Sequence, residues 1–210
     1  MDDKRYSCEH VVPIEQEPRH HLVIENEFVR AFAVEIAPHD RTLCHHHPHD
    51  YLLYVVGDGD IVSAARDEEP KKLNYRDGEC ELLQAGMVHV VENLGDAAFR
   101  NVVVELLPRA DGLRRGADPV LIAGEPNITR CFEDERAAIF LLEMKSGSEA
   151  LISGPVVVAG SPCGDRPEPH ITGLNDFDHL AWIPPGQKVR LQTPADDFRR
   201  ALLFQVGRNR

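Results

Sequence analysis

The sequence predicts an all-β protein that consists of two similar domains in tandem. Strand signals are many and short, helical periodicity is scarce, and the two halves of the chain look like weak copies of each other. Short runs rich in Val, Ile, Leu and Phe alternate with turn residues, as in GDGD at 57–60 and NLGD at 93–96. Many short strands with regular turn signals are typical of a β-sandwich or a β-barrel.

Nine segments carry the strand signal, and they fall into two groups along the chain. The segments are 28–36, 51–56, 60–64, 87–92, 99–107, 138–144, 155–159, 188–192 and 200–206. Between the groups, the polar stretch 108–119 contains two Gly and two Pro, which indicates a linker. We therefore expect one domain over residues 1–112 and a second over residues 113–210.

Three pairs of short segments favour an internal duplication. Residues 83–86 align with 183–186, residues 99–101 with 198–200, and residues 34–36 with 142–144. The offsets are 100, 99 and 108 residues, and insertions and deletions in loops explain why they are not identical. Self-similarity at a roughly constant spacing predicts that one domain of about 100 residues occurs twice.

Charge and hydropathy exclude two classes of partner. The formal net charge is −12, and no cluster of Lys and Arg offers the basic face that nucleic acid requires. The nearest group, Arg109, Arg114 and Arg115, is expected to be a solvated part of the linker. No apolar run approaches the length of about 18 residues that indicates a membrane span. The polar N-terminus MDDKRYSCEH lacks the pattern of a signal peptide, so a cytoplasmic location is expected.

Cysteine usage favours a reducing compartment. The five cysteines are Cys8, Cys44, Cys80, Cys131 and Cys163. Their number is odd and no CxxC motif occurs, which disfavours a disulfide framework.

The stretch CHHHPHD at residues 44–50 is the strongest chemical signal. In a strand, His45 and His47 share one face while His46 points away, so two imidazoles can chelate one ion. Asp50 follows after a short turn and could add an oxygen, and His89 lies in a later apolar run. Imidazole with carboxylate suits Fe(II), Mn, Ni, Zn or Cu.

The alternative is a solvated polar loop, which the histidine stretch taken alone fits about equally well. The position of His89 favours the metal site. His46 and His49 are expected on the solvent side, and the thiol of Cys44 should face away from the metal.

Residues 78–93 resemble the second motif of the cupin family, G(X)5PXG(X)2H(X)3N. Gly78, the tripeptide 84–86, His89 and Asn93 follow every spacing of this motif. The one departure is Gln84, which stands in the place of Pro.

The first cupin motif, G(X)5HXH(X)3–4E(X)6G, is matched in part. Residues 45–47 supply HXH, and Asp50 followed by Gly57 supplies the second half with Asp in place of Glu. Only two residues separate His47 from Asp50, one fewer than the motif requires, and no Gly precedes the histidines at the motif's spacing.

The resemblance implies two double-stranded β-helix (jelly-roll) barrels in tandem, a bicupin. It implies that the first barrel binds a metal ion through His45, His47, His89 and Asp50. The second barrel should be degenerate and metal-free, because Val189 and Thr193 occupy the positions that His89 and Asn93 hold in the first.

Three alternatives stay open around the first barrel. Because Asp is one methylene shorter than Glu, Asp50 could orient a histidine instead of binding the metal, which leaves a three-histidine site. Tyr51 becomes the neighbouring candidate if the register slips by one residue. Tyr54 shares the strand face of Asp50 and could line the pocket or pack in the core.

The resemblance further implies a metal-dependent enzyme that acts on a small organic molecule, with an Fe(II)-type dioxygenase slightly favoured as its class. The metal is expected to be one divalent transition metal ion, Fe, Mn, Ni, Zn or Cu, with Fe(II) weakly favoured. The alternatives are an isomerase or lyase that uses the metal as a Lewis acid, and a metal-containing module that binds a small ligand. A third and less favoured alternative is a structural bicupin that resembles seed-storage proteins. No cofactor other than the metal and no catalytic side chain is assigned. Pairing of edge strands would allow a homodimer.

Overall fold

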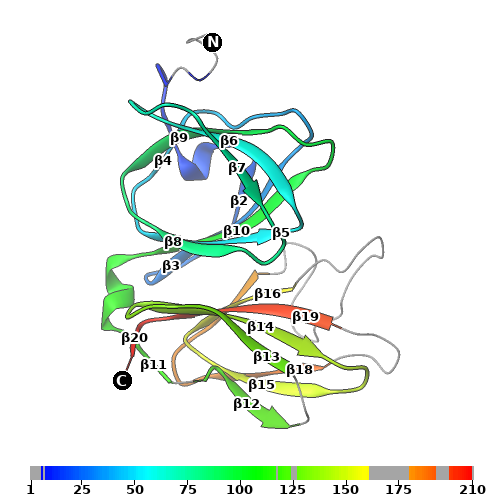
Figure 1. Ribbon diagram of the computed structural model, residues 1–210. Coiled ribbons are helices and arrows are strands. Elements are labelled where there is room, and N and C mark those ends of the chain that lie inside the picture. The colour runs from blue at the N-terminus through cyan, green and yellow to red at the C-terminus, as the bar shows by residue number, and fades with distance from the viewer. Residues whose placement is uncertain are drawn as a thin grey trace. The chain divides into compact units, whose positions relative to one another are not determined.

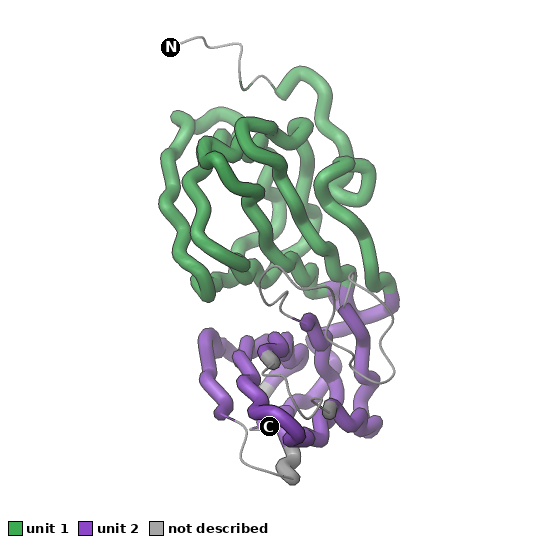
Figure 2. The backbone as a smooth tube through the Cα atoms, turned by 90° about the vertical axis from the view of Figure 1, so that its right-hand side faces the viewer, with its two compact units in different colours: residues 1–25, 30–106 green, residues 26–29, 107–210 purple. Residues whose placement is uncertain are grey.

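The computed structural model describes residues 6, 8–116, 118–123, 127–160, 180–192 and 199–209. Contacts divide the chain into two compact units (Figure 2). Unit 1 contains residues 1–25 and 30–106, and unit 2 contains residues 26–29 and 107–210. The domain boundary expected between residues 112 and 113 stays a sequence-based prediction.

Unit 1 consists of two five-stranded sheets that face each other across a barrel (Figure 1). One sheet has the order β1 (Val12–Pro13), β4 (His45–His47), β9 (Met87–Asn93), β6 (Gly59–Ala65) and β7 (Lys71–Tyr75). The other has the order β2 (His20–Glu25), β3 (Val29–Ile36), β10 (Phe99–Leu106), β5 (Tyr51–Val56) and β8 (Cys80–Leu83). A short 3-10 helix, η1 (Ile14–Gln16), precedes β2.

Side chains that alternate along these strands fill the barrel of unit 1. On β5, Tyr51, Leu53 and Val55 belong to the buried cluster inside the barrel, together with Val103 of β10. Because successive residues of a strand point to opposite faces, polar residues at the same parity also point inward. On β10 these are Asn101 and Glu105, and both are buried.

Unit 2 repeats this architecture. Its five-stranded sheet has the order β13 (Asn127–Glu133), β14 (Ala137–Met144), β19 (Arg199–Val206), β16 (Val156–Gly160) and β17 (Leu180–Ile183). A three-stranded sheet contains β12 (Val120–Ala123), β15 (Glu149–Ser153) and β18 (Lys188–Gln192). A parallel pair joins β11 (Arg114–Arg115) to β20 (Arg208–Asn209), after the 3-10 helix η2 (Pro108–Gly112).

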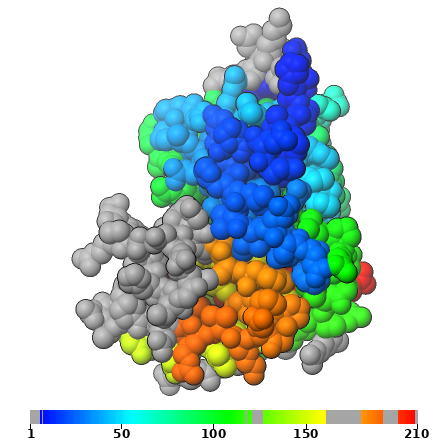
Figure 3. Space-filling model, turned by 180° about the vertical axis from the view of Figure 1, so that it is seen from behind, coloured from blue at the N-terminus to red at the C-terminus, as the bar shows by residue number. Residues whose placement is uncertain are grey.

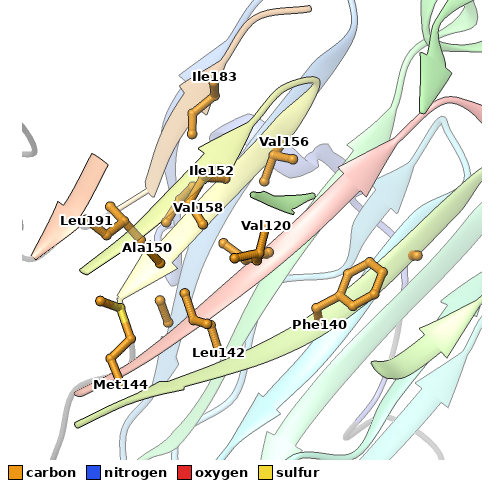
Figure 4. Packing of buried hydrophobic residues seen from close by; sticks show 13 residues of the cluster. Val120, Phe140, Leu142, Met144, Ala150, Ile152, Val156, Val158, Ile183 and Leu191 are labelled. Atoms are coloured by element: carbon orange, nitrogen blue, oxygen red, sulfur yellow. The ribbon is translucent and has the colours of Figure 1, made fainter. Parts of the chain in front are cut away.

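The interior of unit 2 is packed with apolar side chains (Figure 4). Phe140 and Leu142 of β14 pack with Ile152 of β15 and Leu191 of β18 in one buried cluster. Burial of this apolar surface is the main favourable contribution to folding of the unit.

The strand order confirms the expected duplication. The sheet β2-β3-β10-β5-β8 of unit 1 corresponds in order to β13-β14-β19-β16-β17 of unit 2. The turns after β8 and β17 each contain a glycine in the left-handed region, Gly86 with φ of 92° and Gly186 with φ of 78°. A residue with a side chain would be strained at either position. The shared conformation explains why these two glycines align in the sequence.

The nine predicted strands are all present, as β3, β5, β6, β9, β10, β14, β16, β18 and β19. Segments 51–56 and 188–192 keep the predicted bounds, and 45–47 forms the short strand β4. The predicted linker 108–119 is wrong in part, because it contains η2 and β11. Arg109 and Arg114 are exposed, but Arg115 is only 1% exposed and pairs with Glu133 at 3.2 Å. The solvated environment expected for Arg115 is therefore wrong.

The expectation that the cysteines form no disulfide is wrong for one pair. Cys8 and Cys44 are joined by a disulfide although 36 residues separate them in sequence. Strand β1 runs parallel to β4 with Val12 opposite His45, and the Val12 amide donates a hydrogen bond to the Cys44 carbonyl (2.9 Å). The stretch that contains this pairing belongs to the first part of the chain, which covers one face of unit 1 (blue in Figure 3). Cys80 and Cys131 take part in no disulfide among the described residues, and Cys163 lies outside those residues.

This disulfide removes the argument from cysteine usage for a reducing compartment. In the part of the chain that the structure describes, no helix has the length and apolar character that a membrane crossing requires.

Candidate metal centre

Four buried histidines meet inside the barrel of unit 1. The alternation of β4 turns His45 and His47 inward, and the antiparallel pairing of β4 with β9 places His89 opposite His45. His20, the first residue of β2, completes the group from the other sheet. The exposed fractions of His20, His45, His47 and His89 are 8%, 0%, 1% and 8%.

The ring nitrogens of these histidines converge. The Nε2 atom of His47 lies 3.2 Å from Nε2 of His45 and 3.3 Å from Nε2 of His89. His20, His45 and His47 each offer one nitrogen within 4.8 Å of the other two. Nitrogens bound to one ion at about 2.1 Å stand roughly 3–3.5 Å apart, so this spacing fits a single metal ion.

Three of the four rings are oriented through Nδ1. His45 Nδ1 lies 2.9 Å from the Leu43 carbonyl oxygen, and His89 Nδ1 lies 3.2 Å from the Ser63 hydroxyl. His20 Nδ1 lies 2.7 Å from Oε2 of Glu17, a carboxylate that also accepts hydrogen bonds from the backbone amides of residues 19 and 43. Contacts of this kind leave Nε2 directed at the metal position and fix the ring.

Burial favours the neutral form of His45, His47 and His89 because it lowers the pKa of each of these imidazoles. Desolvation, followed by the charge of His20, lowers the pKa of His45 to about 3. Burial and the neighbouring histidines lower the pKa of His47 and of His89 well below the usual value. Neutral imidazole is the form that binds metal ions. Burial alone would raise the pKa of Glu17, but the hydrogen bond from His20 and its charge lower it overall.

His47 is the ring whose Nδ1 has no hydrogen-bond partner, and a buried carboxylate lies beside it. His47 Nδ1 and Oε1 of Glu105 are 3.9 Å apart, and both atoms are buried without a hydrogen bond. The other oxygen of Glu105 accepts a hydrogen bond from Nε of Arg30 at 2.8 Å. Burial raises the pKa of Glu105 to about 7, against the opposing effect of Arg30. His47 Nδ1 and Glu105 Oε1 would form a hydrogen bond if the ring of His47 moved slightly on binding an ion.

Similarity to known proteins is visible in structure and not in sequence. No protein-family model matches the chain, and no curated protein matches its sequence. The chain is similar to the vicilin from Solanum lycopersicum (tomato), at 15% identity with 86% of this chain and 75% of that chain covered and a TM-score of 0.61. It is similar to the vicilin from Solanum melongena at 14% identity, 90% and 82% coverage and a TM-score of 0.61. An oxalate decarboxylase gives 10% identity, 91% and 76% coverage and a TM-score of 0.56.

These similarities extend over both units, and the two barrels repeat one strand order. The chain has the tandem cupin fold. Identities of 15% and below show the fold of this bicupin and nothing about its activity.

Of the four predicted ligands, the bicupin brings three together. His45, His47 and His89 meet as described, whereas Oδ1 of Asp50 accepts a hydrogen bond from the Ala85 amide at 2.7 Å. Among the described residues, the group of three potential ligands whose atoms are mutually close is His20, His45 and His47, so it contains neither Asp50 nor His89, but His89 approaches His47 at 3.3 Å. Its carboxylate instead links the turn before β5 to the turn after β8.

His20 was missed in the sequence because it precedes both motifs by many residues. The available signal was its place at the start of the short stretch HHLVIE, which has three consecutive apolar residues. Of the two tyrosines considered, Tyr51 lines the cavity and stacks on His47 with ring centroids 4.1 Å apart. Tyr54 is buried on the opposite face of β5 and is not among the lining residues. His46 and His49 are half-buried and outside the cluster.

The described part of the second barrel does not repeat this centre. Val189 packs against the apolar cluster of unit 2, at the position that corresponds to His89. Thr193 lies outside the described residues. Within the described part of unit 2, no group of three potential metal ligands occurs.

A cavity of about 370 Å³ opens from the histidines into the first barrel. Its wall is mostly aliphatic and aromatic, with contributions from Leu53, Ile61, Leu73 and Val103. The volume lies in the range of sites for small organic molecules, about 300–1,000 Å³.

Proposed function

We propose that the first barrel of this bicupin binds one divalent transition metal ion through the imidazoles of His45, His47, His89 and His20. We further propose that the centre serves an enzyme that acts on a small organic molecule, with an Fe(II)-type dioxygenase as the favoured class. The observation that carries the proposal is the approach of the Nε2 atoms of His45 and His89 to within 3.2 and 3.3 Å of Nε2 of His47, in a buried site.

The donor set narrows the choice of metal. Imidazole suits Zn, Cu, Fe and Ni, whereas Mn is bound better where carboxylates take part. Bound there, the ion would supply Lewis acidity and, with a redox-active metal, electron transfer to or from the substrate. The barrel's own residues supply the remaining features. The apolar wall excludes water, and Tyr51 holds the ring of His47 in place by stacking.

The experiment is metal analysis after anaerobic purification and reconstitution with Fe, Mn, Ni, Cu or Zn. We expect about one ion per chain, and loss of the ion in His45→Ala and His47→Ala. His46→Ala is the matched control, because this neighbour lies in the same strand and outside the cluster. Equal metal content in His47→Ala and the unaltered protein would overturn the proposed centre.

The class of chemistry needs a separate measurement, because an isomerase, a lyase or a ligand-binding module could use the same centre. Nitric oxide added to the ferrous protein occupies a coordination position that O2 would use. We expect a new electron paramagnetic resonance signal. Its absence in a protein that retains iron would contradict the dioxygenase and leave the Lewis-acid and binding alternatives.

A further inference from the structure

Asn101 is a buried polar side chain that points into the cavity of the first barrel. It lies on the inward face of β10 between Phe99 and Val103, and it is 7% exposed. Within the described residues we find no hydrogen bond of its side-chain amide, and its polar atoms are not fully enclosed by protein. An amide removed from bulk water without a partner costs free energy, and sites that recognise ligands contain such groups because a ligand completes them.

Asn101 lies at a distance from the histidines. Glu105, which is beside His47, and Asn101 are four residues apart on the same strand face. This spacing corresponds to about 13 Å at roughly 3.3 Å per residue. Val103 points inward between them, and its partner Leu53 on β5 also lines the cavity. Val103 and Leu53 therefore separate Asn101 from the histidines along this face of the cavity, and Glu81, which pairs with Leu53, lies at the same level.

A second polar pair reaches from the middle of the cavity toward the Asn101 end, because Glu81 pairs with Leu53 whereas Tyr75 contacts Phe99. The hydroxyl of Tyr75 donates a hydrogen bond to Oε1 of Glu81 at 2.8 Å, and both residues line the cavity. The ring of Tyr75 stacks on Phe99, the inward residue next to Asn101, with centroids 6.0 Å apart. This part of the cavity thus offers an amide, which donates and accepts, and a carboxylate, which accepts.

Charge argues for a neutral ligand group at this end. Lys71 is the one cation among the residues that line the cavity, and it is exposed and paired with Glu68 at 2.6 Å. No cation is therefore placed to receive an anion near Asn101, and Glu81 would repel one. A hydroxyl group can donate to Glu81 and accept from the amide of Asn101.

We propose that the ligand of this cavity is an elongated, mainly apolar molecule with an oxygen group that reaches the histidine end and a hydroxyl group that Asn101 receives. The substrate class is a hydroxylated aromatic or aliphatic carboxylic acid. The proposal rests on the proposed metal centre for the first end only, and the hydroxyl end stands on Asn101, Tyr75 and Glu81.

The test compares two matched probes by calorimetric titration of the metal-loaded protein: 3-(4-hydroxyphenyl)propionate and 3-phenylpropionate. We expect the hydroxylated probe to bind at least about tenfold tighter. In Asn101→Leu the preference should fall toward unity, while binding of 3-phenylpropionate and metal content stay unchanged. Asn74→Leu is the control, because Asn74 is exposed on β7, the strand that carries Tyr75, and does not line the cavity.

Stability separates recognition from a structural role. Asn101→Leu should keep or raise the melting temperature, because it removes an unpartnered buried amide. A marked fall would show that the amide supports the fold and would overturn the proposal.

Equal affinity for the two probes, or no binding of either by a protein that holds its metal, would also overturn it. Failure of the proposed metal centre has a different signature. In that case no ion binds, whereas the preference for the hydroxylated probe and its loss in Asn101→Leu persist.

Discussion

At the scale of single residues, the contact behind each histidine determines how well it can bind an ion. Glu17 is fully buried at its side chain and holds His20 through Nδ1. It also accepts hydrogen bonds from two backbone amides, so the carboxylate is fixed from several directions. A ring held in this way is oriented before the ion arrives.

Glu17→Gln should weaken metal binding on the order of 10- to 100-fold, because the amide orients His20 less strongly than a carboxylate. The measurement is a competition titration of the reconstituted protein against a chelator of known affinity. Glu15→Gln is the control, since Glu15 is exposed and lies outside the cluster. An unchanged affinity in Glu17→Gln would contradict the assignment of His20 as a ligand.

Asp50 gives the opposite expectation. In Asp50→Asn the side-chain oxygen can still accept the hydrogen bond from the Ala85 amide, so metal content should stay at that of the unaltered protein. His89→Ala, measured by the same metal analysis, should lose the ion. If Asp50→Asn loses the ion too, the carboxylate is a ligand, as the motif resemblance implies.

At the scale of elements, strand pairing explains how the histidines are brought together and how strand β4, which carries two of them, is held in place. Strand β4 is only three residues long, and it is held between β9 on one side and β1 on the other. The disulfide from Cys8 to Cys44 joins the stretch before β1 to the residue that precedes His45. The N-terminal stretch therefore supports the strand that carries two of the histidines.

Removal of this disulfide should lower the stability of the first barrel. A closed loop of this length, with a sequence separation of 36 residues, contributes roughly 3–4 kcal/mol in the chain-entropy description. We expect Cys8→Ser combined with Cys44→Ser to shift the urea unfolding midpoint downward. The cysteine variant Cys80→Ser serves as the control. Equal midpoints for the two variants would show that the disulfide is dispensable.

Apolar alternation is a local property, so it predicts elements well. The bounds of the segments 51–56 and 188–192 could be predicted to the residue. Their apolar side chains favour a buried strand whichever sheet the segment joins. Polar strands at sheet edges, such as β7 with the sequence KKLNY, carry no such signal. The pairing of Cys8 with Cys44 and the place of His20 depend on contacts between distant segments, which spacing along the chain does not encode.

At the scale of the whole molecule, one fold occurs twice with different contents. The first barrel contains a cavity and four histidines, whereas the corresponding interior of the second contains Val189 among packed aliphatic side chains. The internal repeat could be predicted from the sequence, and so could the apolar Val189 at the position that corresponds to His89. The resemblance did not supply the actual neighbours of the metal position, because a family motif carries only the residues that family members share.

Because only the first barrel contains the histidine cluster among the described residues, we expect one metal ion per chain. Saturation with the preferred ion should leave about one ion per chain and raise the melting temperature of the first barrel, because a ligand stabilises the folded state that binds it. Calorimetry with and without the ion measures both. Two ions per chain would show that the second barrel has a site of its own.

The most direct test of the metal centre is a crystal structure of the reconstituted protein with anomalous diffraction measured at the absorption edge of the metal. The account predicts one anomalous peak inside the first barrel, at about 2.0–2.2 Å from the Nε2 atoms of His20, His45, His47 and His89. A peak bound through Asp50, a peak elsewhere in the chain, or no peak in protein that carries the metal in solution would contradict it.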